Sequence, residues 1–160
     1  MRGYAKLICL AGAAVMAATV ALGAQAKDDP IVGMWMLDTA KSTFKPGPPP
    51  KSVMLSVDAA GKGYKISVDA VGADGKPMRW GFSTDADGKD APVTGNPNYD
   101  TAALTRLSAG SGTTVYKKGG KPVMTVKSSV SADGKTLTTT ATGTNPAGQE
   151  VHNVSVYMKH

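Results

Sequence analysis

Few side chains in this sequence have the types and spacing for catalysis, and the clearest pair is Glu150 and His152. The two residues stand two positions apart, so on a β-strand both side chains point to the same side, as a general base pair would require. They also follow the glycine turn at Gly148, which favours a solvent-exposed rim over a catalytic centre. We therefore interpret them as surface groups and predict that the protein is not an enzyme.

Three carboxylates, on Asp85, Asp87 and Asp90, lie close enough in sequence to suggest calcium. If Gly88 took the sixth position of a calcium loop, Thr94 would take the twelfth, where a bidentate Glu is needed. The favoured interpretation is a charged hairpin tip, so we predict no metal and no cofactor. The serine in Gly110-Ser111-Gly112 lacks the spacing of a nucleophile elbow and is predicted to lie in a turn.

The N-terminal segment has the parts of a cleavable signal peptide. Arg2 and Lys6 precede an apolar stretch over residues 7–22, and Ala24-Gln25-Ala26 provides a small-residue cleavage site. We predict a signal peptide over residues 1–26, one domain over residues 27–160, and a periplasmic or secreted location without stable membrane insertion. The only cysteine, Cys9, falls in the predicted signal peptide, so no disulfide is expected.

The net charge of +6 is spread over the chain. Most lysines, such as Lys62, Lys76 and Lys121, fall at predicted loop tips, so they do not form a stripe that follows a phosphate backbone. We predict no nucleic-acid partner.

Glycine turns divide the chain into short alternating strands. Asp-Gly-Lys occurs at residues 74–76, 87–89 and 133–135, and each copy predicts a hairpin turn because Asp and Gly tolerate positive φ. Before the first of these turns, the sequence predicts a strand over residues 31–37, a short helix-tolerant stretch over residues 38–44 capped by Asp38, and an extended proline linker.

Apolar residues alternate with polar ones in several of the predicted strands, as in Val53, Leu55 and Val57. About eight to ten such strands joined by tight turns predict an all-β fold, a single up-and-down antiparallel β-barrel, because closure removes exposed strand edges. A sandwich remains an alternative, but only the proline linker and residues 91–100 would supply its long connections.

The first predicted strand carries Gly33-Met34-Trp35, which looks like the G-x-W feature of lipocalin-type barrels, whose Trp packs across the barrel floor. Together with residues 41–44, 93–97, 130–137 and 156–159, it resembles small secreted bacterial proteins with a lipocalin-like (calycin-type) domain, largely of unassigned function. The resemblance implies a lipocalin-like barrel in the bacterial envelope. Lipocalins cover the Trp with an Arg after the last strand; this chain has Lys159 there.

Aromatic residues make up only 6% of the chain, so the barrel interior is predicted to be incompletely filled. We therefore predict binding of a small apolar ligand, with Trp80 pointing at it and Trp35 closing the floor. The alternative is a packed structural or protein-interaction module of the cell envelope without a ligand. The predicted ligand-binding residues face inward: Tyr64, Ile66, Val68, Met78, Trp80, Phe82, Met124 and Val126.

Overall fold

Ten antiparallel strands form one continuous sheet in the computed structural model, which describes residues 28–160. Strands that follow one another in sequence pair with one another, except β4 and β5, which form the two ends of the sheet. Strand β1 also pairs with β10, so the order across the sheet is β4-β3-β2-β1-β10-β9-β8-β7-β6-β5. The strands are β1 (Gly33–Leu37), β2 (Ser52–Ala60), β3 (Gly63–Val71), β4 (Pro77–Thr84), β5 (Asp87–Pro92), β6 (Thr101–Ser108), β7 (Ser111–Lys118), β8 (Lys121–Val130), β9 (Thr136–Thr144) and β10 (Glu150–Lys159).

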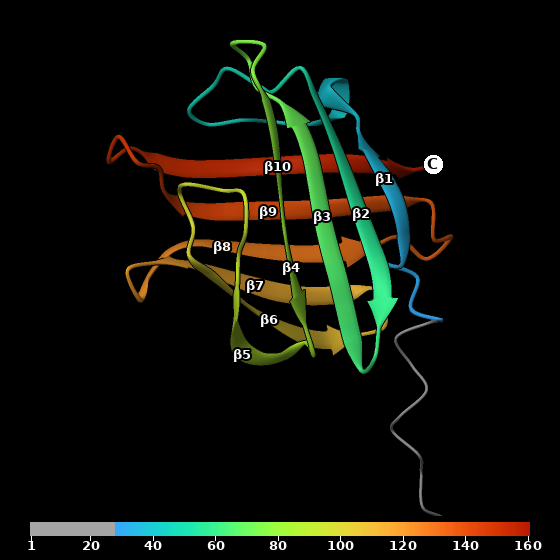
Figure 1. Ribbon diagram of the computed structural model, residues 1–160. Helices are drawn as coiled ribbons and strands as arrows, with labels where there is room; N and C mark the ends of the chain where they lie inside the picture. Colours follow the sequence, from blue (N-terminus) through green and yellow to red (C-terminus); the bar gives the residue numbers. More distant parts are fainter. Residues whose placement is uncertain (1–27) are drawn as a thin grey trace, which may run out of the picture.

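The sheet curls until its two end strands nearly meet. The contact between them is an isolated bridge from Gly81 of β4 to Thr94, just beyond β5, with both N···O distances at 3.0 Å. In Figure 1 strands β1 to β4 run across strands β6 to β10, so the curled sheet encloses the interior between two layers. The predicted all-β, up-and-down barrel is confirmed, and the sandwich alternative is wrong because the sheet is continuous.

The segment between β1 and β2 continues along β10. Asp38 caps the short 3-10 helix η1 (Thr39–Lys41), as predicted, and accepts a hydrogen bond from the Lys41 backbone N–H at 3.3 Å. Beyond the helix, Thr43 bridges to Val154 of β10, and the proline linker then crosses to β2 without forming helix or strand. No helix within residues 28–160 is long and apolar enough to span a bilayer.

The predicted hairpin turn at Asp87-Gly88-Lys89 is wrong. These residues begin β5, which pairs with β6 through a register shift between Asp87 and Asp90, and Gly88 has a φ of +83°. Positive φ serves a β-bulge as well as a turn, so the same dipeptide signals either. The other two Asp-Gly-Lys copies do form turns, after β3 and after β8. The predicted turn position of Ser111 is wrong as well, because Ser111 begins β7.

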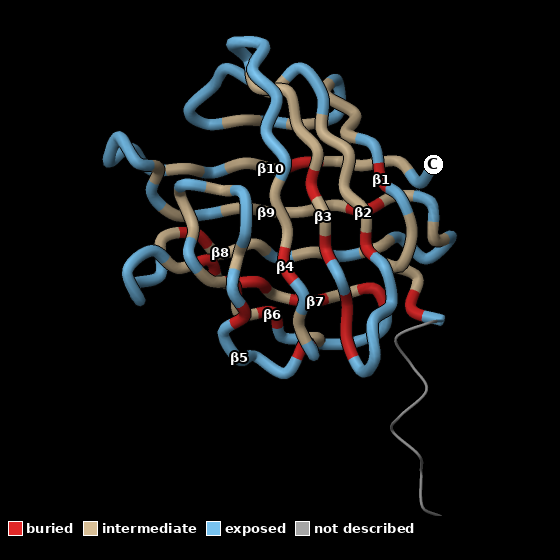
Figure 2. The backbone as a smooth tube through the Cα atoms, in the orientation of Figure 1, coloured by how far each residue is buried: buried red, intermediate tan, exposed pale blue. Residues whose placement is uncertain are grey.

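Inward-facing residues form the core, as the alternation predicted. Leu55 of β2 pairs with Trp35 of β1 and with Val68 of β3, and Val68 pairs in turn with Trp80 of β4, so all four share the inner face. Trp35 and Leu137 are fully buried. Figure 2 shows buried stretches on both layers of the barrel, with exposed residues concentrated in the loops.

We expect Gly134→Val to destabilise the fold by about 1–3 kcal/mol, because Gly134 has a φ of +71° in the turn after β8 and a β-branched residue is strained there. Gly134→Asn is the matched control, since Asn tolerates this conformation and open space surrounds the position. Urea unfolding measures both variants. Equal stability of Gly134→Val and the wild type would contradict the turn.

Candidate functional site

Trp35 closes one end of the barrel, which we call the floor. Its indole Nε1 donates a hydrogen bond to the Ile31 carbonyl at 2.8 Å, and its ring is fully buried. The Lys159 ammonium lies 5.0 Å from the ring centroid and donates to the Pro30 carbonyl at 3.0 Å. Lys159 therefore covers the tryptophan by a cation–π contact, the role that the resemblance to lipocalins gives to an arginine.

Asp29 is the polar centre of the floor, and sequence reasoning missed it. Its carboxylate is 1% exposed and accepts hydrogen bonds from the Tyr64 hydroxyl at 2.8 Å and from Arg106 Nε at 2.7 Å. Two backbone N–H groups, of Ile31 at 3.1 Å and Gly110 at 2.8 Å, donate to its other oxygen. The buried charge is thus paired and fully hydrogen-bonded, as burial requires.

These contacts set the pKa values of the floor residues. Burial works to raise the pKa of Asp29, but the hydrogen bonds from Ile31, Tyr64, Arg106 and Gly110 outweigh it and lower the pKa below its ordinary value. Burial and the neighbouring carboxylate raise the pKa of Tyr64 to about 12. At neutral pH the floor therefore holds an ionised Asp29 and a protonated Tyr64.

Aromatic rings fill one side of the interior above the floor. Tyr99, in the connection after β5, stacks on Tyr116 of β7 with centroids 4.7 Å apart. Trp80 meets Tyr116 edge-on at 5.6 Å, and Phe82 meets it at 6.0 Å. Burial raises the pKa of the Tyr116 hydroxyl, so this group stays neutral. The connection that carries Tyr99 thus packs against the interior.

The eight predicted ligand-binding residues all lie at inward-facing positions, but they divide into different parts of the barrel. Tyr64 belongs to the floor, where its hydroxyl is taken by Asp29. Ile66 also lines a floor cavity of only about 30 Å³, room for about one water molecule. Trp80 and Val126 are half-buried, and Met78 is 40% exposed. The remaining three, Val68, Phe82 and Met124, are buried.

The interior is more open away from the floor. Val53, Ala70 and Met78 pair with one another across β2, β3 and β4, so they share the inner face, and all three keep solvent access. On the opposite layer Ala141 pairs with Asn153, and both are half-buried. We call these five residues the mouth. Its positions carry no charged side chain, whereas Arg106 and Lys159 lie at the floor.

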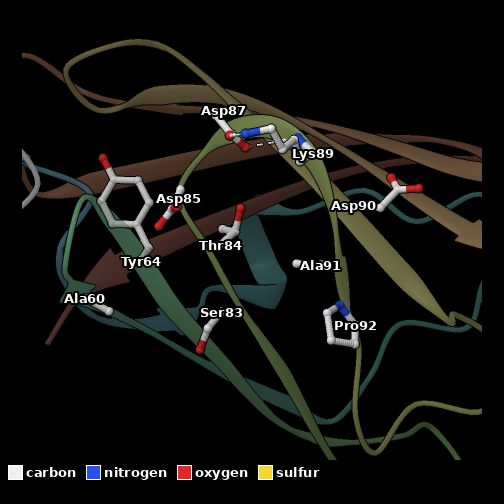
Figure 3. Close-up of a pocket in the computed structure, with 10 residues that line it drawn as sticks. All are labelled: Ala60, Tyr64, Ser83, Thr84, Asp85, Asp87, Lys89, Asp90, Ala91 and Pro92. Carbon is white, nitrogen blue, oxygen red and sulfur yellow. Dashed lines mark hydrogen bonds and ion pairs between the residues drawn. The ribbon is translucent and has the colours of Figure 1, made fainter.

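A second opening lies at the seam between β4 and β5, where a pocket has a volume of about 370 Å³. Figure 3 shows the residues that line it. Its rim carries the ion pair of Asp87 with Lys89 at 2.6 Å, and Asp90 pairs with Lys117 at 2.8 Å. Among residues 28–160 no group of three or more His, Cys, Asp and Glu side chains is arranged to hold a metal ion. The residues that line the pocket are Ala60, Tyr64, Ser83, Thr84, Asp85, Asp87, Lys89, Asp90, Ala91 and Pro92.

Glu150 and His152 lie on β10 as predicted, at exposed positions that alternate with the half-buried Val151 and Asn153. The two side chains therefore face away from the barrel interior and from the mouth. The residues of the predicted signal peptide, Cys9 included, lie outside the described range.

The sequence matches no known protein family and no curated protein. Among solved structures, the fold is similar to a zebrafish ileal bile acid-binding protein in complex with cholic acid. The two share 13% sequence identity at a TM-score of 0.48, over 82% of this chain and 99% of that one. This similarity says nothing about what the present chain binds.

We expect Asp29→Asn to destabilise the protein by about 3 kcal/mol at neutral pH, because it removes the buried charge that pairs with Arg106. The pKa of Asp29 is lowered in the folded state, so its stabilisation is complete above its unfolded-state pKa of 3.8 and is lost as the pH falls through the folded-state value. The stability difference between wild type and variant should therefore shrink as the pH falls below about 3.8.

Denaturant unfolding at several pH values measures this difference, and Asp28→Asn, at the exposed neighbouring residue, is the control. A difference that stays constant down to the lowest pH would contradict the ionised, hydrogen-bonded Asp29.

Proposed function

We propose that the protein binds a small, uncharged, largely apolar molecule in the barrel interior, entering at the mouth. The proposal rests on one observation: side chains that face inward at Val53, Ala70 and Met78 keep solvent access, whereas those at the floor are sealed. Apolar surface that faces an interior and is still wetted is stabilised when a ligand covers it.

The inward-facing groups indicate what kind of ligand fits. Half-buried apolar residues, Leu55, Val126 and Ala141 among them, supply the contact surface. Hydroxyl groups lie deeper in the interior. Burial raises the pKa of the Tyr157 hydroxyl, and hydrogen bonds with the Ser155 and Thr139 side chains offset only part of this rise. A ligand with an apolar body and one hydroxyl or carbonyl group matches this lining, and a charged group would have no partner at the mouth.

The contacts at the floor determine which part of the interior is open to the ligand. Trp35, Lys159 and Asp29 are tied by hydrogen bonds and a cation–π contact and leave a cavity of about 30 Å³ there. A ligand therefore has to occupy the half of the interior towards the mouth, beside Trp80.

We expect Ala141→Phe to weaken ligand binding at least about tenfold, because the added ring would fill inward-facing space beside Val126 and Asn153. Titration of tryptophan emission with fatty-acid, retinoid-like and isoprenoid probes measures it. Thr142→Phe, an exposed and outward-facing position next along β9, is the matched control and should bind as the wild type does.

The source of the signal is tested by Trp80→Phe and Trp35→Phe. Quenching should disappear in Trp80→Phe and persist in Trp35→Phe, since Trp35 is sealed in the floor. If no probe of these classes changes the wild-type emission at micromolar concentration, the ligand-binding proposal fails and the packed envelope module replaces it.

We also propose that this binding takes place outside the cytoplasm, because residues 1–26 have the composition of a signal peptide. The intact mass of the protein recovered from the periplasm or medium of its host should correspond to a chain beginning at Lys27. Recovery only from the cytoplasm with residues 1–26 attached would contradict export.

A further inference from the structure

Methionines gather on the outer face of the barrel around β1. Strand pairing places Met36 of β1 directly between Met54 of β2 and Met158 of β10. Paired residues share a face, and this face is the outer one because the neighbouring Trp35 points inward. Met34 lies two positions before Met36 on the same face. Four of the six methionines from residue 28 onward are therefore brought together from distant parts of the chain.

These side chains remain accessible. Met36 is 43% and Met34 is 40% exposed, while Met54 and Met158 are half-buried. Met36 and Met54 also line a surface hollow of about 560 Å³. Exposure of several large apolar side chains in one place costs hydrophobic free energy, so such a cluster calls for a functional reason.

The sulfur of Met158 faces polar groups rather than the core. Thr136 Oγ1 lies 3.9 Å from Met158 Sδ and Lys41 Nζ lies 4.0 Å from it, both as donors. The Met158 sulfur thus lies on the outer side of the sheet, and a metal ion bound there would replace these two weak donors. Side chains on paired strands have Cβ atoms about 5 Å apart, and the three rotatable bonds of methionine let neighbouring sulfur atoms converge.

We propose that Met36, Met54 and Met158 form a surface site for a soft monovalent metal ion, Cu(I) or Ag(I). Neutral thioethers are ligands that soft ions prefer and that Mg²⁺, Ca²⁺ and Zn²⁺ do not. Three of them from adjacent strands supply a trigonal set without any change in oxidation state or protonation. The three methionine side chains point to the opposite face of the sheet from the ligand-binding interior.

Cationic side chains lie near the three methionines. Arg79, which pairs with Asp69, lines the surface hollow. Lys41 lies beside Met158 and pairs with Asp38 at 3.1 Å; its side chain is 61% exposed, so it is free to swing towards solvent when a metal ion binds. Its charge weakens binding of a cation, and Lys41→Gln should therefore raise the affinity a few-fold.

The test uses the full chain with Cys9→Ser, so that no thiol competes for the metal. Titration with Ag(I), and with Cu(I) under anaerobic conditions against a chromogenic chelator, should show one ion bound per chain. With methyl-¹³C methionine, the methyl resonances of Met36, Met54 and Met158 should shift, whereas that of the buried, inward-facing Met124 should not.

Met36→Leu conserves side-chain volume and should weaken binding at least about tenfold without changing the melting temperature. Met124→Leu is the matched control, since Met124 is buried on the inner face and does not line this hollow. The affinity should also stay constant between about pH 5 and pH 8, because a thioether loses no proton on binding, unlike an imidazole or a carboxylate.

Failure to bind Ag(I), equal affinity of Met36→Leu and the wild type, or an equal loss in Met124→Leu would each overturn the proposal. Loss of affinity on acidification would assign the ion to a histidine or carboxylate site instead.

Discussion

The carboxylate of Asp29 holds the two layers of the barrel together at the floor. It accepts hydrogen bonds from Tyr64 on β3, in one layer, and from Arg106 on β6 and the backbone of Gly110, in the other. The same carboxylate fixes the chain at Ile31, whose carbonyl receives the Trp35 indole N–H. A single buried charge therefore positions the first strand, the tryptophan and the end of the barrel that is closed.

Solvent access differs between the sealed floor and the rest of the interior. Ladders join all neighbouring strands except β4 and β5, the two ends of the sheet, where an isolated bridge links Gly81 of β4 to Thr94, just beyond β5. The aromatic rings of Tyr99, Tyr116 and Trp80 pack behind this seam and shield it from within. Solvent access to inward-facing apolar residues then remains chiefly at the mouth, where the inner face is lined by small side chains and Met78.

Local sequence patterns predicted most of the strands. The features that they did not predict depend on tertiary contacts. Alternation and glycine turns were sufficient for β2, β3 and β4, because each of these strands has one wet and one apolar face. Strand β5, with the sequence Asp-Gly-Lys-Asp-Ala-Pro, has no such alternation, and its sequence predicts a turn. It is a strand only because it pairs with β6.

The same contrast between local sequence patterns and tertiary contacts applies to the candidate sites. The alternation of apolar and polar residues predicted that the eight ligand-binding candidates face inward. It did not predict which of them lie at the floor. Asp29 and Arg106 are 77 residues apart, and no spacing links them. The row of Met36, Met54 and Met158 likewise becomes visible only when the register of β1 with β2 and β10 is known.

The central claim is that the interior towards the mouth holds a small apolar molecule. Native mass spectrometry of the wild-type protein, purified gently from its own host, tests this most directly, with Ala141→Phe purified in parallel. The account predicts a wild-type mass that exceeds the chain mass by one small molecule, removable with organic solvent and missing from the variant. A wild-type protein at its bare chain mass, or the same added mass in both proteins, would contradict it.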